Sequence, residues 1–196
     1  MTSPKLKVNS VRDLVALAKS KPGQVNYGSV GIADVLYLTV EMLKVEANID
    51  VVSIPYKGQA QIGVALRADE VQFAIVSMST NMPNVRAGNM RALAVTGGKR
   101  SKLAPELPIF AESGFPSVES SSWFGIFAPA GTPRDIIQRV QRASTKVLSA
   151  PEMRDHLINQ GQDAVGSTPE QFEMRFKADV AKYQALVKQV GILPQD

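Results

Sequence analysis

Apolar residues recur at two kinds of spacing along the first 96 residues, and the two kinds alternate. Short apolar runs predict strands over 25–29, 51–54, 71–76 and 90–96. Helical spacing between these runs predicts helices over about 10–22, 34–46, 58–66 and 81–86. Such an alternation is typical of an α/β fold, in which helices cover both faces of a mostly parallel sheet. Ligands of these sheets bind beyond the carboxyl ends of the strands.

The pattern changes after Gly98. We predict a proline-rich connector over 103–108, a short helix that ends at Gly114, and an extended segment over 118–128. Two helices then open on similar motifs, Thr132-Pro133-Arg134-Asp135 and Thr168-Pro169-Glu170-Gln171, in which the threonine is predicted to be the N-cap. The last helix is expected to bury a face whose residues recur at three- and four-residue spacing: Phe172, Phe176, Val180, Tyr183, Val187 and Val190.

The most informative segment runs from Val25 to Asp34, where a predicted strand passes through small residues into the start of a helix. Backbone N–H groups in the first turn of that helix are expected to face outward and to attract a small anion. Asp34 has two compatible interpretations, because its carboxylate can cap the helix and can also repel an incoming acid. The candidate ligand contacts at this sheet edge are Ser29, Gly31, Ile32, Ala33, Asp34, Tyr56, Lys57 and Ser77.

Each candidate also has a purely structural interpretation. Ser29 and its small neighbours serve a tight strand-to-helix turn equally well, and the loop that holds Tyr56 and Lys57 can be a structural element. Trp123 and Phe124 fit a core or hinge position better than a stacking platform for a ligand.

Composition excludes several kinds of chemistry. The chain has no cysteine and a single histidine, His156, which lies between charged neighbours on a predicted helix. Thiolate chemistry, cysteine zinc sites and disulfides are therefore excluded, and serine–histidine catalysis has one candidate residue. We expect no catalytic residue, no metal site and no cofactor. The net charge of +4 comes from dispersed basic residues, so no nucleic-acid partner is expected.

We expect neither a membrane-spanning helix nor a secretory signal peptide in this sequence. No apolar run approaches the length of about 18 residues that a membrane-spanning helix needs. The first residues lack the charged start, apolar core and cleavage site of a secretory signal peptide.

Five segments follow one another in register: Asn26-Tyr27-Gly28-Ser29, Ile54–Gly58, Arg86–Gly88 with Arg91–Thr96, Trp123–Gly125 with Ala128–Pro133, and Gly166–Phe172. Together they resemble the Bug-type extracytoplasmic solute receptors of tripartite tricarboxylate transporters, over the latter two thirds of such a receptor. The resemblance implies a type II periplasmic-binding-protein-like fold that closes two lobes on a small carboxylate. It also implies a periplasmic location, transporter membrane subunits as partners, and no catalysis.

The resemblance further implies a domain organisation. Residues 1–115 correspond to the second, ligand-binding lobe, 116–132 to a crossover or hinge, and 133–196 to C-terminal helices that pack on the first lobe. The opening strands of that first lobe have no counterpart, so the first lobe is expected to be incomplete. At about 25 cal/mol per Å² of apolar surface, leaving several large side chains exposed costs several kcal/mol. We therefore expect a homo-oligomer.

One departure from the family concerns the ligand. Bug-type receptors usually carry a small polar pair where this chain has Asp34-Val35. A carboxylate about 4 Å from Asp34 meets a repulsion of about 1 kcal/mol in water and about 4 kcal/mol at an effective dielectric constant of 20. The ligand is then neutral or cationic, or Asp34 turns away, or nothing binds.

Three functional classes follow. The leading one is a solute-binding receptor for a small organic acid or related metabolite. The alternative is a degenerate, non-binding receptor that acts as an interaction or assembly module. A related possibility is the effector lobe of a transcription regulator, which shares this kind of fold. An enzyme is the least expected class, because Ser29, Asp34 and Lys57 form no recognised catalytic arrangement.

Overall fold

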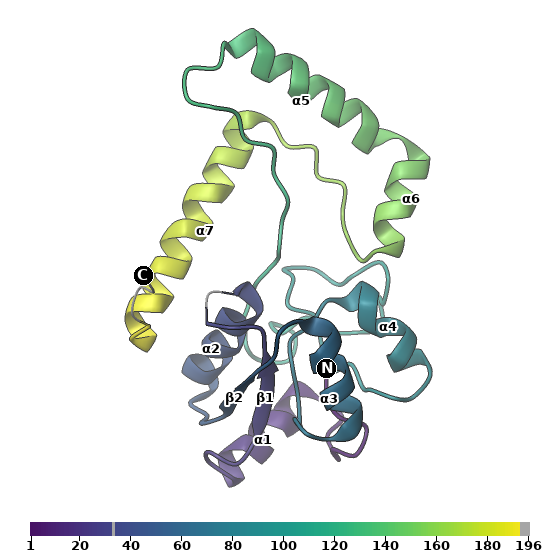
Figure 1. Ribbon diagram of the computed structural model, residues 1–196, viewed down its shortest axis with the longest axis vertical. Coiled ribbons are helices and arrows are strands. Elements are labelled where there is room, and N and C mark those ends of the chain that lie inside the picture. Colours follow the sequence, from purple (N-terminus) through teal and green to yellow (C-terminus); the bar gives the residue numbers. More distant parts are fainter. Residues whose placement is uncertain (33, 193–196) are drawn as a thin grey trace. The chain divides into compact units, whose positions relative to one another are not determined.

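The computed structural model describes residues 1–32 and 34–192, and the elements of its first half follow the predicted order (Figure 1). They are α1 Val11–Ser20, β1 Asn26–Ser29, α2 Val35–Ala47, β2 Val52–Pro55, α3 Gln59–Ala68 and α4 Met78–Arg86. The described chain divides into two compact units. Unit 1 contains residues 1–121 and 186–192, and unit 2 contains residues 122–185.

Short polar side chains set the ends of the helices in unit 1. Ser10 caps α1, since its hydroxyl accepts a hydrogen bond from the backbone N–H of Asp13 at 3.1 Å. The carboxylate of Asp13 in turn accepts from the N–H of Asn9 at 2.9 Å. Helices α2 and α3 are followed by the C-cap residues Asn48 and Asp69, whose φ angles of 49° and 67° are left-handed. Asn and Asp tolerate that conformation, which explains why both helices stop without glycine.

The regular sheet consists of β1 and β2, which pair in parallel with Tyr27 opposite Ser53 and Ser29 opposite Pro55. The predicted strands over 71–76 and 90–96 form only isolated bridges, at Phe73, Arg91 and Val95, and of these only Phe73 pairs with the sheet, at Tyr27. Thr2 lies between two of them and bridges both Phe73 and Arg91 in the antiparallel sense. The prediction of two further regular strands was therefore wrong. The short segment around Thr2 lies between residues 71–76 and 90–96, and it is too short to form a continuous ladder with either.

The two faces of β1 carry different helices (Figure 1). The phenol of Tyr27 donates a hydrogen bond to Glu41 on α2 at 3.1 Å. Gly28 faces the opposite side, where an added Cβ would lie 2.7 Å from Cγ2 of Ile62 on α3. Gly28 thus permits the close approach of α3 to the sheet. The core on the α3 side is formed by Ile62, Ala65, Leu66, Val71, Ala74 and Met90.

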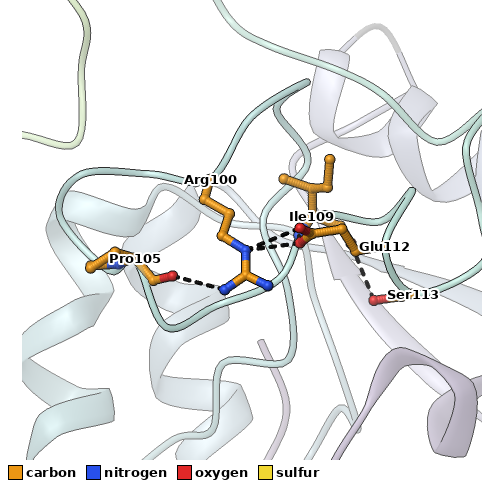
Figure 2. A network of polar contacts seen from close by, with 5 residues as sticks. All are labelled: Arg100, Pro105, Ile109, Glu112 and Ser113. Carbon is orange, nitrogen blue, oxygen red and sulfur yellow. Dashed lines mark hydrogen bonds and ion pairs between the residues drawn. The ribbon is translucent and has the colours of Figure 1, made fainter.

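Side-chain contacts, rather than a helix, hold the connector that follows Gly98 (Figure 2). Nε of Arg100 donates to the Glu112 carboxylate at 2.9 Å, and its Nη1 donates to the carbonyl of Pro105 at 3.1 Å. The same carboxylate accepts from the N–H of Ile109 at 2.9 Å. The predicted short helix before Gly114 was wrong: residues 110–114 form turns. Only one helical turn forms, in which the N–H of Ser113 bonds the carbonyl of Ile109 at 3.2 Å, and Gly114 leaves it at a φ of 97°. Helix α4 begins at Met78, three residues before the prediction.

Unit 2 contains α5 Arg134–Ser149, α6 Pro151–Asn159 and most of α7 Pro169–Val190. The capping motif at Thr168 is confirmed, because its hydroxyl accepts from the N–H of Gln171 at 3.2 Å and the Gln171 side chain accepts from the N–H of Thr168 at 3.0 Å. The prediction for Thr132 was wrong. Its hydroxyl donates to the carbonyl of Pro129 at 2.8 Å, so Pro133 occupies the N-cap position without a side-chain cap.

No residue of unit 2, all of which the structure describes, is buried. Its aromatic residues still gather: the Trp123 ring meets Phe172 edge to face at 5.0 Å, and Phe127 and Phe176 complete the group. We expected Phe124 in a core or a hinge, and its exposed fraction of 87% contradicts the core position. The expected burial of the α7 face was also wrong for Phe176 and Val180, which stay exposed. Apolar residues of α5 are exposed as well.

Candidate ligand-binding site

Three segments of unit 1 end at one edge of the sheet. The parallel pairing of β1 with β2, and of Tyr27 with Phe73, brings together the loops that follow Ser29, Pro55 and Phe73. Helices α2, α3 and α4 each begin after one of these loops. The structure therefore brings Ser29, Lys57 and Ser77 to the same edge, as the sequence predicted.

The first turn of α3 ties two of these loops together. The side-chain oxygen of Gln61 accepts from the N–H of Lys57 at 3.0 Å, and that of Gln59 accepts from the N–H of Ser77 at 2.8 Å. Sequence reasoning missed both glutamines. Their only signal is their position directly after Gly58, where a helix start leaves side chains free to reach neighbouring backbone.

Ser29 ends β1 and is only 5% exposed. Its hydroxyl lies 2.8 Å from the hydroxyl of Ser53, and its carbonyl accepts from the N–H of Tyr56 at 2.8 Å. Gly31 follows with a φ of 126°, a conformation that favours glycine, and a Cβ at this point would meet nothing within 4 Å. The loop after β1 thus has open space beside it.

Asp34 is the N-cap of α2, as one of its two interpretations predicted. Its Oδ1 atom accepts from the backbone N–H of Leu36 at 2.7 Å. The Asp34 carboxylate therefore occupies the N–H of Leu36, a donor that would otherwise be available to a bound anion. Ile32 is half-buried in the turn just before, and Ala33 lies outside the described residues.

The loop that follows β2 contains a structural residue, Tyr56, and an exposed cation, Lys57. Tyr56 packs against the α3 core, and burial raises the pKa of its phenol, with a smaller contribution from Glu70. This packing supports the structural interpretation of Tyr56. Lys57 is exposed and supplies a positive charge at the edge. Ser77 is half-buried at the N-cap of α4, where its hydroxyl lies 3.1 Å from that of Ser79.

Sequence reasoning also missed a buried polar group on the α2 face of the sheet. Glu41 is 5% exposed, and its Oε1 accepts from Tyr27 at 3.1 Å and from Nζ of Lys44 at 2.9 Å. Burial raises the pKa of Tyr27, and the neighbouring Glu41 adds to the rise. The available signal was an acidic residue on the mostly apolar helix α2.

Unit 2 adds a separate surface hollow between α5 and α6, lined in part by Lys146, Met153 and His156. His156 is exposed and its Nε2 lies 2.9 Å from the Gln160 side chain. No residue predicted as a ligand contact lines this hollow. Across residues 1–32 and 34–192, no three His, Cys, Asp or Glu side chains are grouped to hold a metal ion. None of the helices within these residues is long and apolar enough to cross a membrane.

Comparison with known proteins gives a consistent set of relatives. The family described as "Tripartite tricarboxylate transporter family receptor" matches residues 1–192. A UPF0065 protein from the tcbD–tcbE intergenic region of Pseudomonas sp. strain P51 is 32% identical over 178 residues, which are 90% of this chain and 53% of that protein. Protein BugT of Bordetella pertussis is 30% identical over 191 residues, 97% of this chain and 59% of BugT.

A solved structure described as R. palustris Rpa4515 with adipate superposes with a TM-score of 0.87 at 30% identity. The match covers 99% of this chain and 65% of that one. The chain thus spans a little over half the length of the curated relatives that it matches.

Proposed function

Because this chain belongs to the tripartite tricarboxylate transporter receptor family, we propose that it is a solute-binding protein for a small organic acid or a related metabolite. It delivers this solute to the membrane subunits of a transporter of the same type. The observation that carries the proposal is the sheet edge of unit 1, where three helices begin beside Ser29, Lys57 and Ser77. The relative described with adipate supports a carboxylate ligand. The family consists of receptors and not of enzymes.

The site residues have different roles in this proposal. The loop of Ser29, Gly31 and Ile32 contacts the ligand through side chains and backbone groups. Lys57 faces a ligand carboxylate as its counter-charge, and Ser77 supplies a hydroxyl from the third loop. Asp34 disfavours an acid placed directly at the start of α2, because its own carboxylate already holds the N–H of Leu36.

The family also supports a location and a division of the chain. We infer a periplasmic location. Residues 1–115 act as the ligand-binding lobe, 116–132 as the crossover, and 133–196 as the helices that pack on a first lobe.

A second candidate function is a non-binding assembly module, and two observations favour it. Asp34 occupies part of the anion position, and unit 2 exposes apolar residues on α5 and α7, among them Ile136 at 44% and Val180 at 37%. Such surfaces drive association of copies of the chain.

Thermal unfolding with small mono- and dicarboxylates, amides and amines distinguishes the two functions. A ligand of the folded chain at 100 times its Kd stabilises it by about 2.7 kcal/mol and raises the Tm by several degrees. We expect this with at least one acid, and a smaller rise in Lys57→Ala. Lys19→Ala removes an exposed lysine on α1 and is the control. A Tm that no compound raises contradicts solute binding and favours the assembly module.

A further inference from the structure

Two adjacent loops at the sheet edge of unit 1 carry opposite polarity. The first connects β1 with α2 and ends at Asp34, and the second connects β2 with α3 and contains Lys57. Ser29 and Pro55 are register partners at the ends of the two strands, and the Ser29 carbonyl accepts from the N–H of Tyr56 at 2.8 Å. The two loops therefore leave the sheet side by side, with an acceptor on one and donors on the other.

The first loop presents an acceptor. The N–H of Asp34 bonds the carbonyl of Gly31 at 3.3 Å, so the chain turns here and keeps Asp34 close to the edge. Among contacts within residues 1–32 and 34–192, only Oδ1 of the Asp34 carboxylate is engaged, by the N–H of Leu36 at 2.7 Å. The same contacts give Asp34 no ion pair. An ionised carboxylate has about four lone-pair sites, so Asp34 retains acceptor capacity for a cationic donor.

The second loop presents donors. Lys57 is exposed, and its ammonium makes no hydrogen bond or ion pair in the part of the chain that the structure describes. Gln59 is the first residue of α3, and its side-chain oxygen accepts from the N–H of Ser77 at 2.8 Å. Because a backbone N–H only donates, this contact fixes which end of the amide is the oxygen. It leaves the NH2 group, with two N–H donors, for a further partner.

The two charges at this edge do not neutralise each other. The structure describes both Asp34 and Lys57, and no ion pair joins them. Each charge therefore stays available to a ligand. A molecule that bridges the loops presents a cation to Asp34 and an anion to Lys57 and Gln59. Since these residues belong to different loops and stay apart, the cation and the anion of the ligand are separated by several bonds.

We propose that the ligand is an ω-amino acid, whose ammonium group pairs with Asp34 and whose carboxylate pairs with Lys57 and the amide of Gln59. The inference rests on the proposed solute-binding function and narrows its ligand class. It gives Asp34 a positive role in recognition, because the carboxylate that repels the second acid group of a dicarboxylate attracts an ammonium group at the same place.

Three probes that differ only at the end far from the carboxylate test this inference in the full chain by calorimetry: adipate, hexanoate and ε-aminohexanoate. Their far ends are negative, neutral and positive. We expect ε-aminohexanoate to bind about tenfold more tightly than hexanoate, as one hydrogen bond to a charged group predicts, and adipate to bind most weakly. Succinate, butyrate and γ-aminobutyrate repeat the series at a shorter length, and the order is read in the series that binds more tightly.

An isomer tests the separation of the charges. L-norleucine has the same atoms as ε-aminohexanoate but carries its ammonium group beside the carboxylate. We expect it to bind about tenfold more weakly than ε-aminohexanoate, because it cannot reach both loops in the same way.

Asp34→Asn separates recognition from a structural role. Asparagine keeps a side-chain oxygen for the N–H of Leu36 and removes the charge. We expect the affinity for ε-aminohexanoate to fall about tenfold, that for adipate to rise at least about tenfold, and that for hexanoate to stay unchanged. Asp34→Ser serves the same purpose where Asp34→Asn does not fold. Asp50→Asn, at an exposed carboxylate elsewhere, is the control and keeps the wild-type order. Lys57→Gln should weaken all three probes, since they share the carboxylate.

The outcomes distinguish the inference from the function on which it rests. If hexanoate, adipate or L-norleucine binds the wild-type chain as tightly as ε-aminohexanoate, the inference is overturned and solute binding stands. Equal weakening of all three probes in Asp34→Asn also overturns it, because a structural role alone has that effect. If the wild-type chain binds none of these probes, the inference fails, and the wider panel of compounds in thermal unfolding decides separately whether solute binding fails with it.

Discussion

The Oδ1 atom of Asp34 lies 2.7 Å from the backbone nitrogen of Leu36, so the first turn of α2 is capped by a charged residue. Replacing Asp34 with serine keeps a capping oxygen and removes the charge. We expect Asp34→Ser to raise the affinity for a small dicarboxylate by one to three orders of magnitude, since the repulsion removed is about 1 to 4 kcal/mol. Calorimetric titration with adipate measures the change.

Two controls accompany this variant. Asp50→Ser removes an exposed carboxylate elsewhere and should leave the affinity unchanged. Asp34→Ala removes the cap as well as the charge and should lower the free energy of unfolding by about 1 kcal/mol. Equal adipate affinities in wild type and Asp34→Ser would show that the carboxylate does not face the ligand.

The contact between Gly28 and Ile62 predicts a large effect from a single methyl group. A Cβ on residue 28 would lie 2.7 Å from Cγ2 of Ile62, so Gly28→Ala must push α3 away from the sheet. We expect the free energy of unfolding to fall by about 1 to 3 kcal/mol in a urea titration. Gly58→Ala is the matched control, because its φ of 177° is extended and nothing lies within 4 Å of its Cβ. A loss of the same size in both variants would refute this explanation.

The amino group of Met1 predicts a pH dependence in a chain that begins at this residue. The group donates to the carbonyl of Ala74 at 2.8 Å, and burial lowers its pKa from 8.0 to about 5. Between these values the unfolded chain binds the proton and the folded chain does not. Stability therefore falls as the pH drops from 8 to 5, by at most about 4 kcal/mol.

Urea unfolding at pH 5, 6.5 and 8 measures this dependence. A chain acetylated at Met1 carries no titrating amino group and should lose the part of the slope that the amine causes. Identical slopes for the free and acetylated chains would contradict the assignment.

The exposed apolar residues of α5 and α7 predict self-association. Val140 and Val180 are exposed at helix positions that also carry Ile136 and Phe176, each four residues away. Sedimentation over a range of concentrations should show a mass above that of one chain. Val140→Asp and Val180→Asp should shift the distribution toward single chains. Val165→Asp, at an exposed residue outside these helices, should not. A single-chain mass at every concentration would refute self-association.

The sequence predicts a helix cap correctly where the capping residue and its hydrogen-bond partner lie in the same short segment. Thr168 was predicted as a cap and acts as one, because its partner Gln171 lies three residues away in the same segment. Thr132 has the same motif, yet its hydroxyl bonds the preceding turn. Nothing local decides between these two partners. The strands over 71–76 and 90–96 depend on residues 1–3, which are distant in sequence and too few to show a period.

The candidate site divides in the same way. The shared position of Ser29, Lys57 and Ser77 could be predicted, because the carboxyl ends of parallel strands meet at one edge of a sheet. Ser53, Tyr27 and Glu41 could not, since their relationship depends on the register of β1 with β2 and on how α2 rotates over the sheet. Gln59 and Gln61 similarly bond backbone groups of two different loops.

Trp123 gives unit 2 an optical label of its own. It is the sole tryptophan of the chain, its indole N–H donates to Asp179 at 2.7 Å, and Phe172 and Phe176 surround its ring. Emission excited at the red edge of the tyrosine band therefore comes from unit 2 alone. Circular dichroism follows the helices of both units, so a melting curve that differs from that of Trp123 emission would show that the two units unfold in sequence.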